Sequence, residues 1–237
     1  MNLDTKKLHS LLRKVSLGGL IVDCFLQVEG RDGKASALDF TSTIFVQSEG
    51  RIGDDKSCNE ILSLREIGKL CKFVGDIKDK EDAIEAEIKD NRICLSSKMK
   101  GSVKFLLGEV EKGQQDKANK GIDEILKVVK NKKELKEERI NEALYFVNLF
   151  SCEELLFKVK NGKMSIESLE DSIQIFSVPM GKEDKGDLIL RFNAQFFKAV
   201  MSEIDWESKD VPVMLYEKDS PIVFQQGKSV WILALIS

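Results

Sequence analysis

The chain has 237 residues, of which 42% are hydrophobic and 32% are charged, and its formal net charge is −3. This length suits one large domain or two of about 120 residues, and the overall charge gives no reason to expect nucleic-acid binding. No apolar run approaches the roughly 18 residues of a membrane span, and the first residues lack the apolar stretch of a signal peptide, so we expect no membrane partner.

The reactive residue types give little support for an enzyme. The histidine count is one, and that residue, His9, is expected at the surface. The five cysteines have no paired spacing, and we expect reduced core thiols rather than metal ligands. No phosphate-cradling glycine motif is present, and the carboxylates fall in charged runs such as 78–82 and 132–138, which are typical of solvated faces. We therefore predict no catalysis, no cofactor and no metal.

The first half begins with a predicted amphipathic helix over residues 5–15, which ends at Gly18-Gly19. Its apolar residues recur at helical spacing, and its other side is basic, which indicates either a solvated face or a surface for phosphates. Strand-like runs follow, and then a second helix, which the pattern Ser63-Leu64-Arg65-Glu66 predicts to begin with a capping box. The strands are expected at 20–28, 35–40, 43–47 and 61–63, and again after the second helix at 83–88, 92–97 and 102–110.

The composition changes after residue 108, where a polar segment without aromatic residues begins. We predict a linker over 111–133 between domains at 1–110 and 134–237. Ile125 and Leu126 are too apolar for a pure spacer, and both a strand and a short helix remain open there.

Beyond this linker the order of elements starts again. A helix is expected over 135–150, and an Asn161-Gly162 hairpin turn and a helix capped by Asn193 follow later. The predicted strands of this half are 154–160, 164–169, 172–178, 188–192, 213–217, 222–225 and 229–236. The closing SVWILALI is similar to SVKFLL at 102–107. Matching elements keep an offset of about 130 residues, which predicts two copies of one α+β domain.

The duplicated chain resembles the two-domain DNA polymerase sliding clamp, a processivity factor, over nearly its full length. The similarity is carried by EILSLREIGKLCKFV, by DLILRFNAQFFKAVMSEI and by DSPIVFQQGKSVWILALI, together with VQSEG after a long strand. Viral or phage clamps and the archaeal and eukaryotic type are resembled about equally.

The resemblance implies a homotrimer that closes into a six-domain ring around duplex DNA. Helices would line the hole and offer basic side chains to the phosphates without reading bases. The DNA-binding residues implied are Lys6, Lys7, Arg13, Lys14, Arg65, Lys69, Lys72, Lys136, Arg139 and Lys198. Edges at 102–110 and 172–178 would join the subunits, through Val103, Phe105, Leu107, Ile173, Ile175 and Val178.

The resemblance also implies protein partners. A replicative DNA polymerase would bind a pocket beside the last strand and the linker, made by Ile125, Leu126, Leu233, Ala234 and Leu235, unless residues 232–236 form only a core strand. The proline common at this place in the family is absent here. A clamp-loading ATPase would open the ring. We expect the protein in the cytoplasm or at the nucleoid, or in the replication compartment of a host cell if it is viral.

The third predicted helix departs from a basic inner face. It mixes Lys136 and Arg139 with Glu137, Glu138 and Glu142, and the fourth helix offers mainly Lys198. This leaves two further hypotheses, a monomeric processivity subunit of the same shape and one member of a hetero-oligomeric ring.

Overall fold

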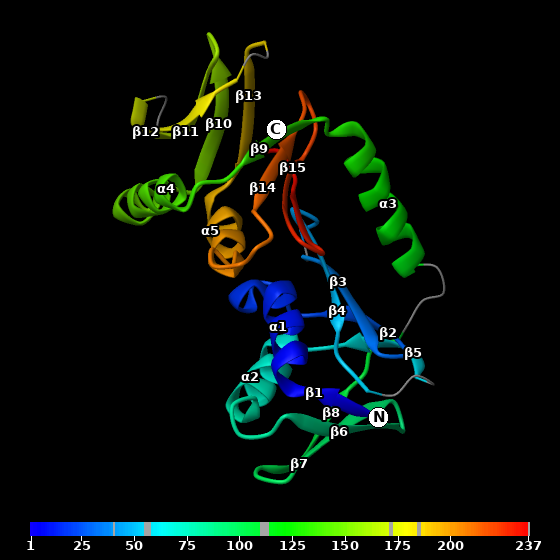
Figure 1. The fold of residues 1–237 in the computed structure, drawn as a ribbon. Helices are drawn as coiled ribbons and strands as arrows, with labels where there is room; N and C mark the ends of the chain where they lie inside the picture. Colours follow the sequence, from blue (N-terminus) through cyan, green and yellow to red (C-terminus); the bar gives the residue numbers. More distant parts are fainter. Residues whose placement is uncertain (40, 55–57, 110–113, 171–172, 184–185, 237) are drawn as a thin grey trace. The chain divides into compact units, whose positions relative to one another are not determined.

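The computed structural model describes residues 1–237 except 40, 55–57, 110–113, 171–172, 184–185 and 237 (Figure 1). The chain divides into two compact units. The first contains Met1–Gly121 with Lys228–Val230, and the second contains Ile122–Gly227 with Trp231–Ser237. Each unit is made of α-helices and antiparallel strands, and each is described by itself.

The first unit has a strand, a helix, four strands, a second helix and three strands. The four central strands lie in the order β5-β2-β3-β4, and the first strand joins the last three in the order β1-β6-β7-β8. The bounds are β1 (Asn2–Asp4), α1 (Thr5–Ser16), the short 3-10 helix η1 (Leu17–Gly19), β2 (Cys24–Glu29), β3 (Asp32–Leu38), β4 (Ile44–Arg51), β5 (Asn59–Leu64), α2 (Ile67–Ile77), β6 (Ala83–Lys89), β7 (Arg92–Ser97) and β8 (Gly101–Leu106).

The helix ends of the first unit differ from the sequence-based expectation. Asp4 caps α1 by accepting a hydrogen bond of 3.0 Å from the Lys7 N–H. Leu17, rather than a glycine, takes the left-handed conformation at the end of α1, with φ of 46°. The predicted capping box at α2 is wrong, because Ser63 lies within β5 and Glu66 precedes the helix in a left-handed conformation.

The segment predicted to be a linker contains regular structure. Helix α3 (Gln114–Val128) and strand β9 (Asn131–Glu134) both lie in it, so the helix and the strand that the sequence left as alternatives are both present. The division between the two units falls within α3, between Gly121 and Ile122.

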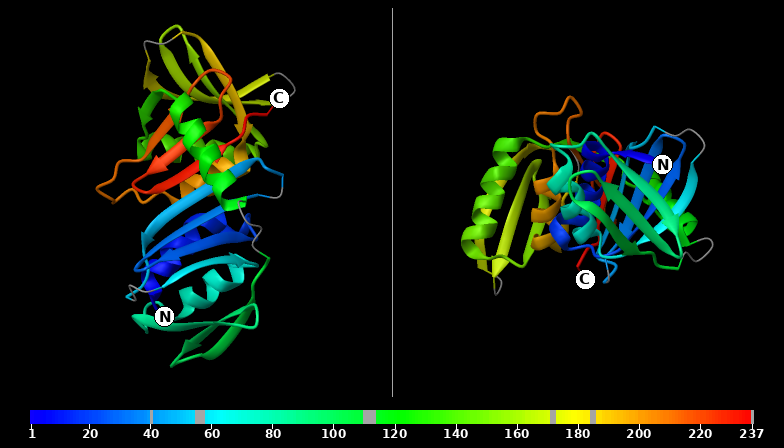
Figure 2. Two further views of the ribbon diagram at one scale, coloured as in Figure 1. Left: turned by 90° about the vertical axis from the view of Figure 1, so that its right-hand side faces the viewer. Right: turned by 90° about the horizontal axis from the view of Figure 1, so that it is seen from below.

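The second unit repeats the plan of the first, as the further views in Figure 2 also show. Its strands lie in the orders β13-β10-β11-β12 and β9-β14-β15-β16. After β9 the bounds are α4 (Glu137–Phe150), β10 (Glu154–Lys160), β11 (Lys163–Glu170), β12 (Ile173–Lys182), β13 (Leu188–Asn193), α5 (Ala194–Glu203), β14 (Val213–Tyr216), β15 (Ile222–Gln226) and β16 (Ser229–Leu233). The α+β duplication predicted from the sequence is confirmed.

Two local predictions in the second unit are also confirmed. Asn161 and Gly162 have φ of 50° and 71°, which is the left-handed turn geometry of a tight hairpin between β10 and β11. Asn193 caps α5 by accepting a hydrogen bond of 3.1 Å from the Phe196 N–H. Aromatic residues fill the core beneath these elements, where Phe157 and Tyr216 meet edge to face with ring centroids 4.9 Å apart.

Candidate functional site

Helices α1 and α2 form the basic surface of the first unit. They pack against each other and bury Leu8, Leu12 and Val74. At their contact Gly75 faces His9, because a Cβ at position 75 would lie 2.9 Å from His9 Nε2. His9 is therefore half-buried between the helices, and the expectation of a simple surface residue is wrong. Burial, together with the charges of Lys78 and Arg13, lowers the pKa of His9.

The basic side chains of this pair of helices remain exposed to solvent. Six of the seven residues predicted to meet DNA in this unit are exposed, and Lys14 is half-buried. Lys7 pairs with Asp4 at 3.1 Å and Lys69 with Glu66 at 2.5 Å, both between residues three apart. Such exposed pairs contribute only about 0–1 kcal/mol, so an anion can compete for either lysine at little cost. The structure thus places Lys6, Lys7, Arg13, Lys14, Lys69 and Lys72 on two neighbouring helices, and Arg65 lies just before the start of α2.

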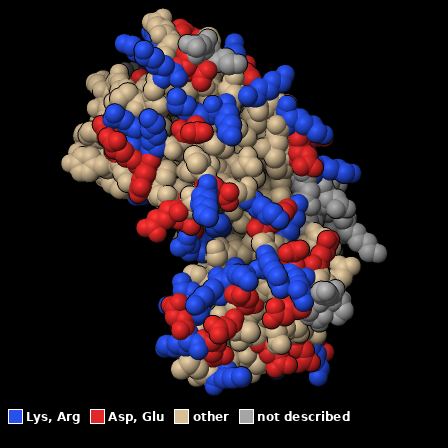
Figure 3. Space-filling view, viewed as in Figure 1, with Lys and Arg blue, Asp and Glu red and all other residues tan. Residues whose placement is uncertain are grey.

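The helices of the second unit are less basic. Glu137 and Glu138 occupy the first turn of α4. Arg139 pairs with Glu142 at 2.9 Å, and Lys198 Nζ donates to Asn148 Oδ1 at 2.6 Å. Lys136 is exposed just before α4 begins. Figure 3 shows charged side chains of both signs intermingled on the first unit and wide uncharged areas on the second.

An apolar surface on α4 was missed by the sequence reasoning. Tyr145 is 62% exposed, Leu149 57% and Phe150 44%. Phe146 lies beside them and stacks on Phe150, with ring centroids 6.3 Å apart, and on Phe176 of β12, at 5.3 Å. The sequence does contain a signal for this surface. The apolar pairs Tyr145-Phe146 and Leu149-Phe150 are not needed for the buried face of α4, so their side chains are expected to be exposed. We call Tyr145, Leu149 and Phe150 the α4 apolar patch.

A cavity joins this patch to strand β12. It has a volume of about 460 Å³ and is lined by the end of α4, by the residues that follow it and by three strands of the sheet, namely Phe150, Ser151, Cys152, Glu153, Glu154, Ser168 and Ile175. Phe150 belongs to the α4 apolar patch and Ile175 to β12, so apolar surface continues from the helix to the edge of the sheet.

Strands β8 and β12 each lie at an edge of a sheet. On β8, Val103 and Phe105 are half-buried, and Phe105 meets Phe73 of α2 with ring centroids 6.5 Å apart. On β12, Ile173 is 70% exposed and Ile175 is half-buried. Leu107 and Val178, which were predicted to join subunits, are buried within their own units. The backbone of Leu107 is also paired within its unit, because its N–H donates to the Asn91 carbonyl at 2.9 Å and its carbonyl accepts from Asn91 Nδ2 at 3.1 Å.

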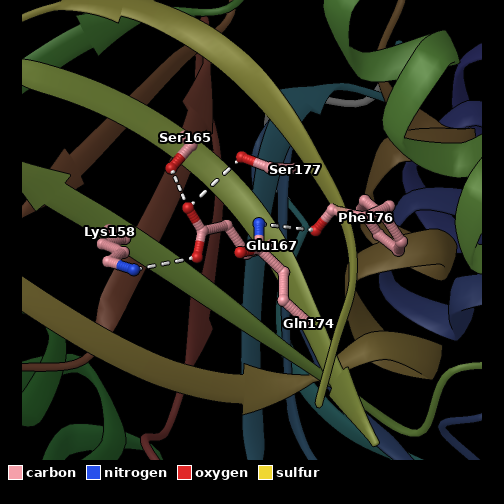
Figure 4. A network of polar contacts seen from close by, with 6 residues as sticks. All are labelled: Lys158, Ser165, Glu167, Gln174, Phe176 and Ser177. Atoms are coloured by element: carbon pink, nitrogen blue, oxygen red, sulfur yellow. Dashed lines mark hydrogen bonds and ion pairs between the residues drawn. The ribbon is translucent and has the colours of Figure 1, made fainter.

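A polar network holds β12 to its sheet (Figure 4). The Glu167 carboxylate of β11 accepts hydrogen bonds from Ser165 at 2.8 Å and from Ser177 of β12 at 3.2 Å, and it pairs with Lys158 of β10 at 3.1 Å. The carboxylate is buried, which by itself raises its pKa, but these partners outweigh burial and lower the pKa of Glu167. Three neighbouring strands are thereby tied to one side chain.

This network lies where the backbone pairing is interrupted. The register between β11 and β12 shifts at Met164/Ser165 and again at Ser168/Leu169. Between those shifts, the two strands pair only from Ser165 opposite Pro179 to Ser168 opposite Phe176. The bond between Glu167 and Ser177 therefore supplements a short and imperfect ladder.

The residues predicted to bind partner proteins all belong to the second unit. Ile125 and Leu126 are half-buried on α3, and Leu233 is buried at the end of β16. Ala234 and Leu235 are half-buried beyond β16, where the Ile236 N–H donates to the Arg191 carbonyl at 2.8 Å. The last residues thus follow strand β13, and Leu233 belongs to the core while the next two side chains are partly accessible.

The described residues contain no group of three or more His, Cys, Asp or Glu side chains that could hold a metal ion. No helix in the described ranges is long and apolar enough to cross a membrane. All five cysteines are free, and burial raises the pKa of the Cys24 thiol.

The fold is that of a DNA polymerase sliding clamp. Similar solved structures are the DNA polymerase III beta chain of Streptococcus pneumoniae (TM-score 0.78, 12% identity), the beta subunit of Thermotoga maritima (0.73, 18%) and the DNA polymerase sliding clamp of Bacillus subtilis (0.75, 11%). Each match covers 100% of this chain and 64%, 65% and 64% of the other chain, respectively. This chain therefore spans slightly less than two thirds of these proteins. No protein-family model and no curated protein sequence matches it.

Proposed function

We propose that this protein is a sliding clamp that encircles duplex DNA as a homotrimer and tethers a replicative DNA polymerase. The observation that carries the proposal is a duplicated unit whose fold matches bacterial clamps over the whole chain. Two units cover about 65% of the Thermotoga chain, which leaves room there for a third unit of the same size. Three copies of the present chain would supply the six units of a closed ring.

The proposed subunit contact joins β8 of one chain to β12 of the next. Both are edge strands, and pairing them would remove two open edges, which natural proteins otherwise protect. Head-to-tail contacts of this kind close into a ring when the rotation per subunit permits. We extend the contact to the α4 apolar patch, because the cavity between Phe150 and Ile175 makes it continuous with β12. This surface is more exposed than any of the six residues predicted at first except Ile173.

The proposed DNA surface is formed mainly by α1 and α2 of each chain. Exposed lysine and arginine side chains give contacts that depend on salt and not on base sequence. Such contacts can be weak, because a closed ring stays on DNA by topology. No catalytic step is proposed for this protein, and a clamp-loading ATPase would have to open the ring wherever the cell replicates DNA.

The proposed groove for partner proteins lies beside the end of β16. Half-buried Ile125, Leu126, Ala234 and Leu235 would receive the apolar side chains of a polymerase segment, which usually supply most of the affinity of such contacts. Buried Leu233 would support this groove from below.

The first test is molar mass by light scattering over a dilution series. A mass near three times 26.8 kDa that persists on dilution supports the ring. The protein should then remain on circular DNA and slide off linear DNA of the same sequence. A trimer that leaves both DNA forms equally fast would contradict encirclement.

A second candidate is a subunit of the same shape that does not close into a ring of identical chains. It is favoured by the acidic first turn of α4 and by the paired state of Arg139. A persistent monomer at micromolar concentration would support it, and mixing with the cognate polymerase would then separate a monomeric processivity subunit from a member of a mixed ring.

A further inference from the structure

A row of lysines crosses three neighbouring strands of the second unit. Lys163 of β11 stands directly opposite Lys160 of β10 on one side and Lys182 of β12 on the other. All three are exposed. Among the residues that the structure describes, none of the three forms an ion pair with an acidic side chain. We call Lys160, Lys163 and Lys182 the lysine row.

The lysine row lies on the open face of the sheet. The opposite face is apolar, with Val159, Met164 and Val178 buried. Helices α4 and α5 cover that apolar face, as the stacking of Phe146 on Phe176 and the contact of Phe197 with Phe192 indicate. The row therefore points away from α4 and α5, and its charges are not part of the surface that these two helices present.

Like charges directly opposite one another destabilise a sheet. Adjacent strands are about 4.8 Å apart, so the three ammonium groups fall within about one Debye length and repel each other at physiological salt. One further lysine adds to the field, since Lys133 Nζ donates to the Lys182 carbonyl at 3.3 Å. The lysine row therefore lowers the stability of the sheet, and such unfavourable arrangements are expected at functional sites.

A cavity of about 350 Å³ opens beside the lysine row. It is lined by Lys158, Lys160, Lys163, Ser165 and Glu167, among others. The Glu167 carboxylate already has three partners, so it offsets Lys158 and leaves the row positive (Figure 4). At the top of the view in Figure 3, the end of the second unit where the β10–β11 hairpin lies in Figure 1, Lys and Arg side chains are exposed with some Asp or Glu side chains among them.

We propose that the lysine row binds an acidic peptide segment of a partner protein. The chemistry required is a polyanion, because three lysines offer charge and donors but no acceptor. Surfaces that bind single-stranded nucleic acid add aromatic side chains on which bases stack, and no aromatic residue lines this cavity. A run of carboxylates meets the charge requirement without such a platform.

The test compares two probes of equal charge by fluorescence anisotropy, a labelled peptide of alternating glutamate and serine and a labelled oligothymidylate. The intact chain is expected to bind the peptide more tightly than the oligonucleotide, and more tightly at low salt than at physiological salt. The double change Lys160→Ala with Lys163→Ala should weaken peptide binding at least about fivefold. The matched control Lys209→Ala with Lys218→Ala removes the same charge from exposed positions elsewhere in this unit and should leave binding unchanged.

A single substitution provides a second readout. Lys163→Glu places an acid between two lysines, so the melting temperature should rise by a few degrees while peptide binding is lost. Equal losses in the two double variants would overturn the site, as would a lower melting temperature for Lys163→Glu. Binding of the oligonucleotide that depends on the lysine row, without binding of the peptide, would overturn the peptide in favour of nucleic acid. None of these measurements requires a ring, so a monomeric chain would leave this result untouched.

Discussion

The two units have the same order of strands and helices but present different helical surfaces. In the first unit, α1 and α2 expose lysine and arginine with no acidic residue in the first turn of either helix. In the second, α4 begins with Glu137 and Glu138 and ends in the exposed Tyr145, Leu149 and Phe150. The buried positions of a duplicated fold constrain each other, whereas exposed positions are free to diverge. The comparison suggests that the first unit supplies the basic surface proposed to contact DNA, and that the second supplies the apolar surface proposed to join subunits.

The largest expected effect concerns the association of subunits through the α4 apolar patch. Changing Tyr145 and Leu149 to serine should raise the dissociation constant of the oligomer by more than about 100-fold, because truncating two apolar side chains buried at a contact costs about 2 kcal/mol each. Light scattering over a dilution series measures this. The control Val211→Ser removes an apolar side chain of similar exposure, 54%, from a loop of the same unit and should not change the mass. Identical dilution curves for all three proteins would remove α4 from the subunit contact.

The second prediction tests the contrast in charge. Changing Lys6, Lys7, Arg13 and Lys14 to alanine should weaken DNA binding by about 10–100-fold and flatten its salt dependence, since each lost phosphate contact lowers the slope by about 0.9. Changing Lys136, Arg139 and Lys198 to alanine should have a much smaller effect. Titration of duplex DNA at several salt concentrations measures both. Equal losses in the two variants would contradict the assignment of charge to the first unit.

The third prediction concerns the network at Glu167, whose side chain is 9% exposed. Glu167→Ala should lower the stability of the second unit by about 1–3 kcal/mol at pH 7, because Ser177 and Lys158 lose their acceptor. Hydrogen exchange should accelerate at β12 and remain unchanged in the first unit. Ser165 donates one hydrogen bond to the same carboxylate, so the control Ser165→Ala should lower the stability by less than Glu167→Ala does.

The pH dependence of this network has a definite sign. The pKa of Glu167 is lowered in the folded chain, so its contribution is present above the ordinary carboxyl value of 4.5 and is lost as pH falls through the folded pKa. The difference in urea midpoint between the native chain and Glu167→Ala should therefore shrink below about pH 4.5. A difference that stays constant into acid would show that the charge of Glu167 is not involved.

The smallest effect separates the units by pH. The single histidine lies in the first unit, and its pKa is lowered on folding. Folding therefore favours the neutral ring, so stability falls as pH drops below the ordinary value of 6.5. The protection of backbone amides at α1 and α2, measured relative to their intrinsic exchange rates at the same pH, should fall slightly between pH 7 and pH 5.5, while protection at α4 and α5 does not respond. His9→Gln should abolish the response.

The sequence predicted the architecture well because periodicity and duplication report on burial. The apolar spacing of Leu8, Leu11, Leu12 and Val15 gave α1, and the Asn161-Gly162 pair gave the β10–β11 hairpin. Segments with weak signals were less accessible. The polar stretch before Ile122 contains the first part of helix α3, whose composition is also typical of a linker. The start of α2 was predicted wrongly because Glu66 takes a left-handed conformation, which a glutamate side chain gives no reason to expect.

The surfaces were only partly accessible from the sequence. Basic residues on α1 and α2 could be placed, since a helical pattern determines which side is exposed. Leu107 and Val178 were placed on the open edges but are buried, because alternation along a strand does not say which face carries the core. The Glu167 network could not be predicted, because Lys158, Ser165 and Ser177 are brought to Glu167 only by the register in which three strands pair. Whether each predicted site residue binds DNA, a partner or another subunit stays a prediction.

Pro179 has a consequence for the life of the newly made chain. In the proposed ring, the β12 edge would stay open until the subunits assemble, and strands of other proteins could pair with it and begin aggregation. Pro179 cannot donate a backbone hydrogen bond and Lys182 adds charge, so clean pairing is restricted to the stretch from Ile173 to Val178. Strand β8 has 6 residues, the same length as that stretch. A longer foreign strand could not pair past the proline, which would favour the proposed contact with β8 over pairing with other proteins.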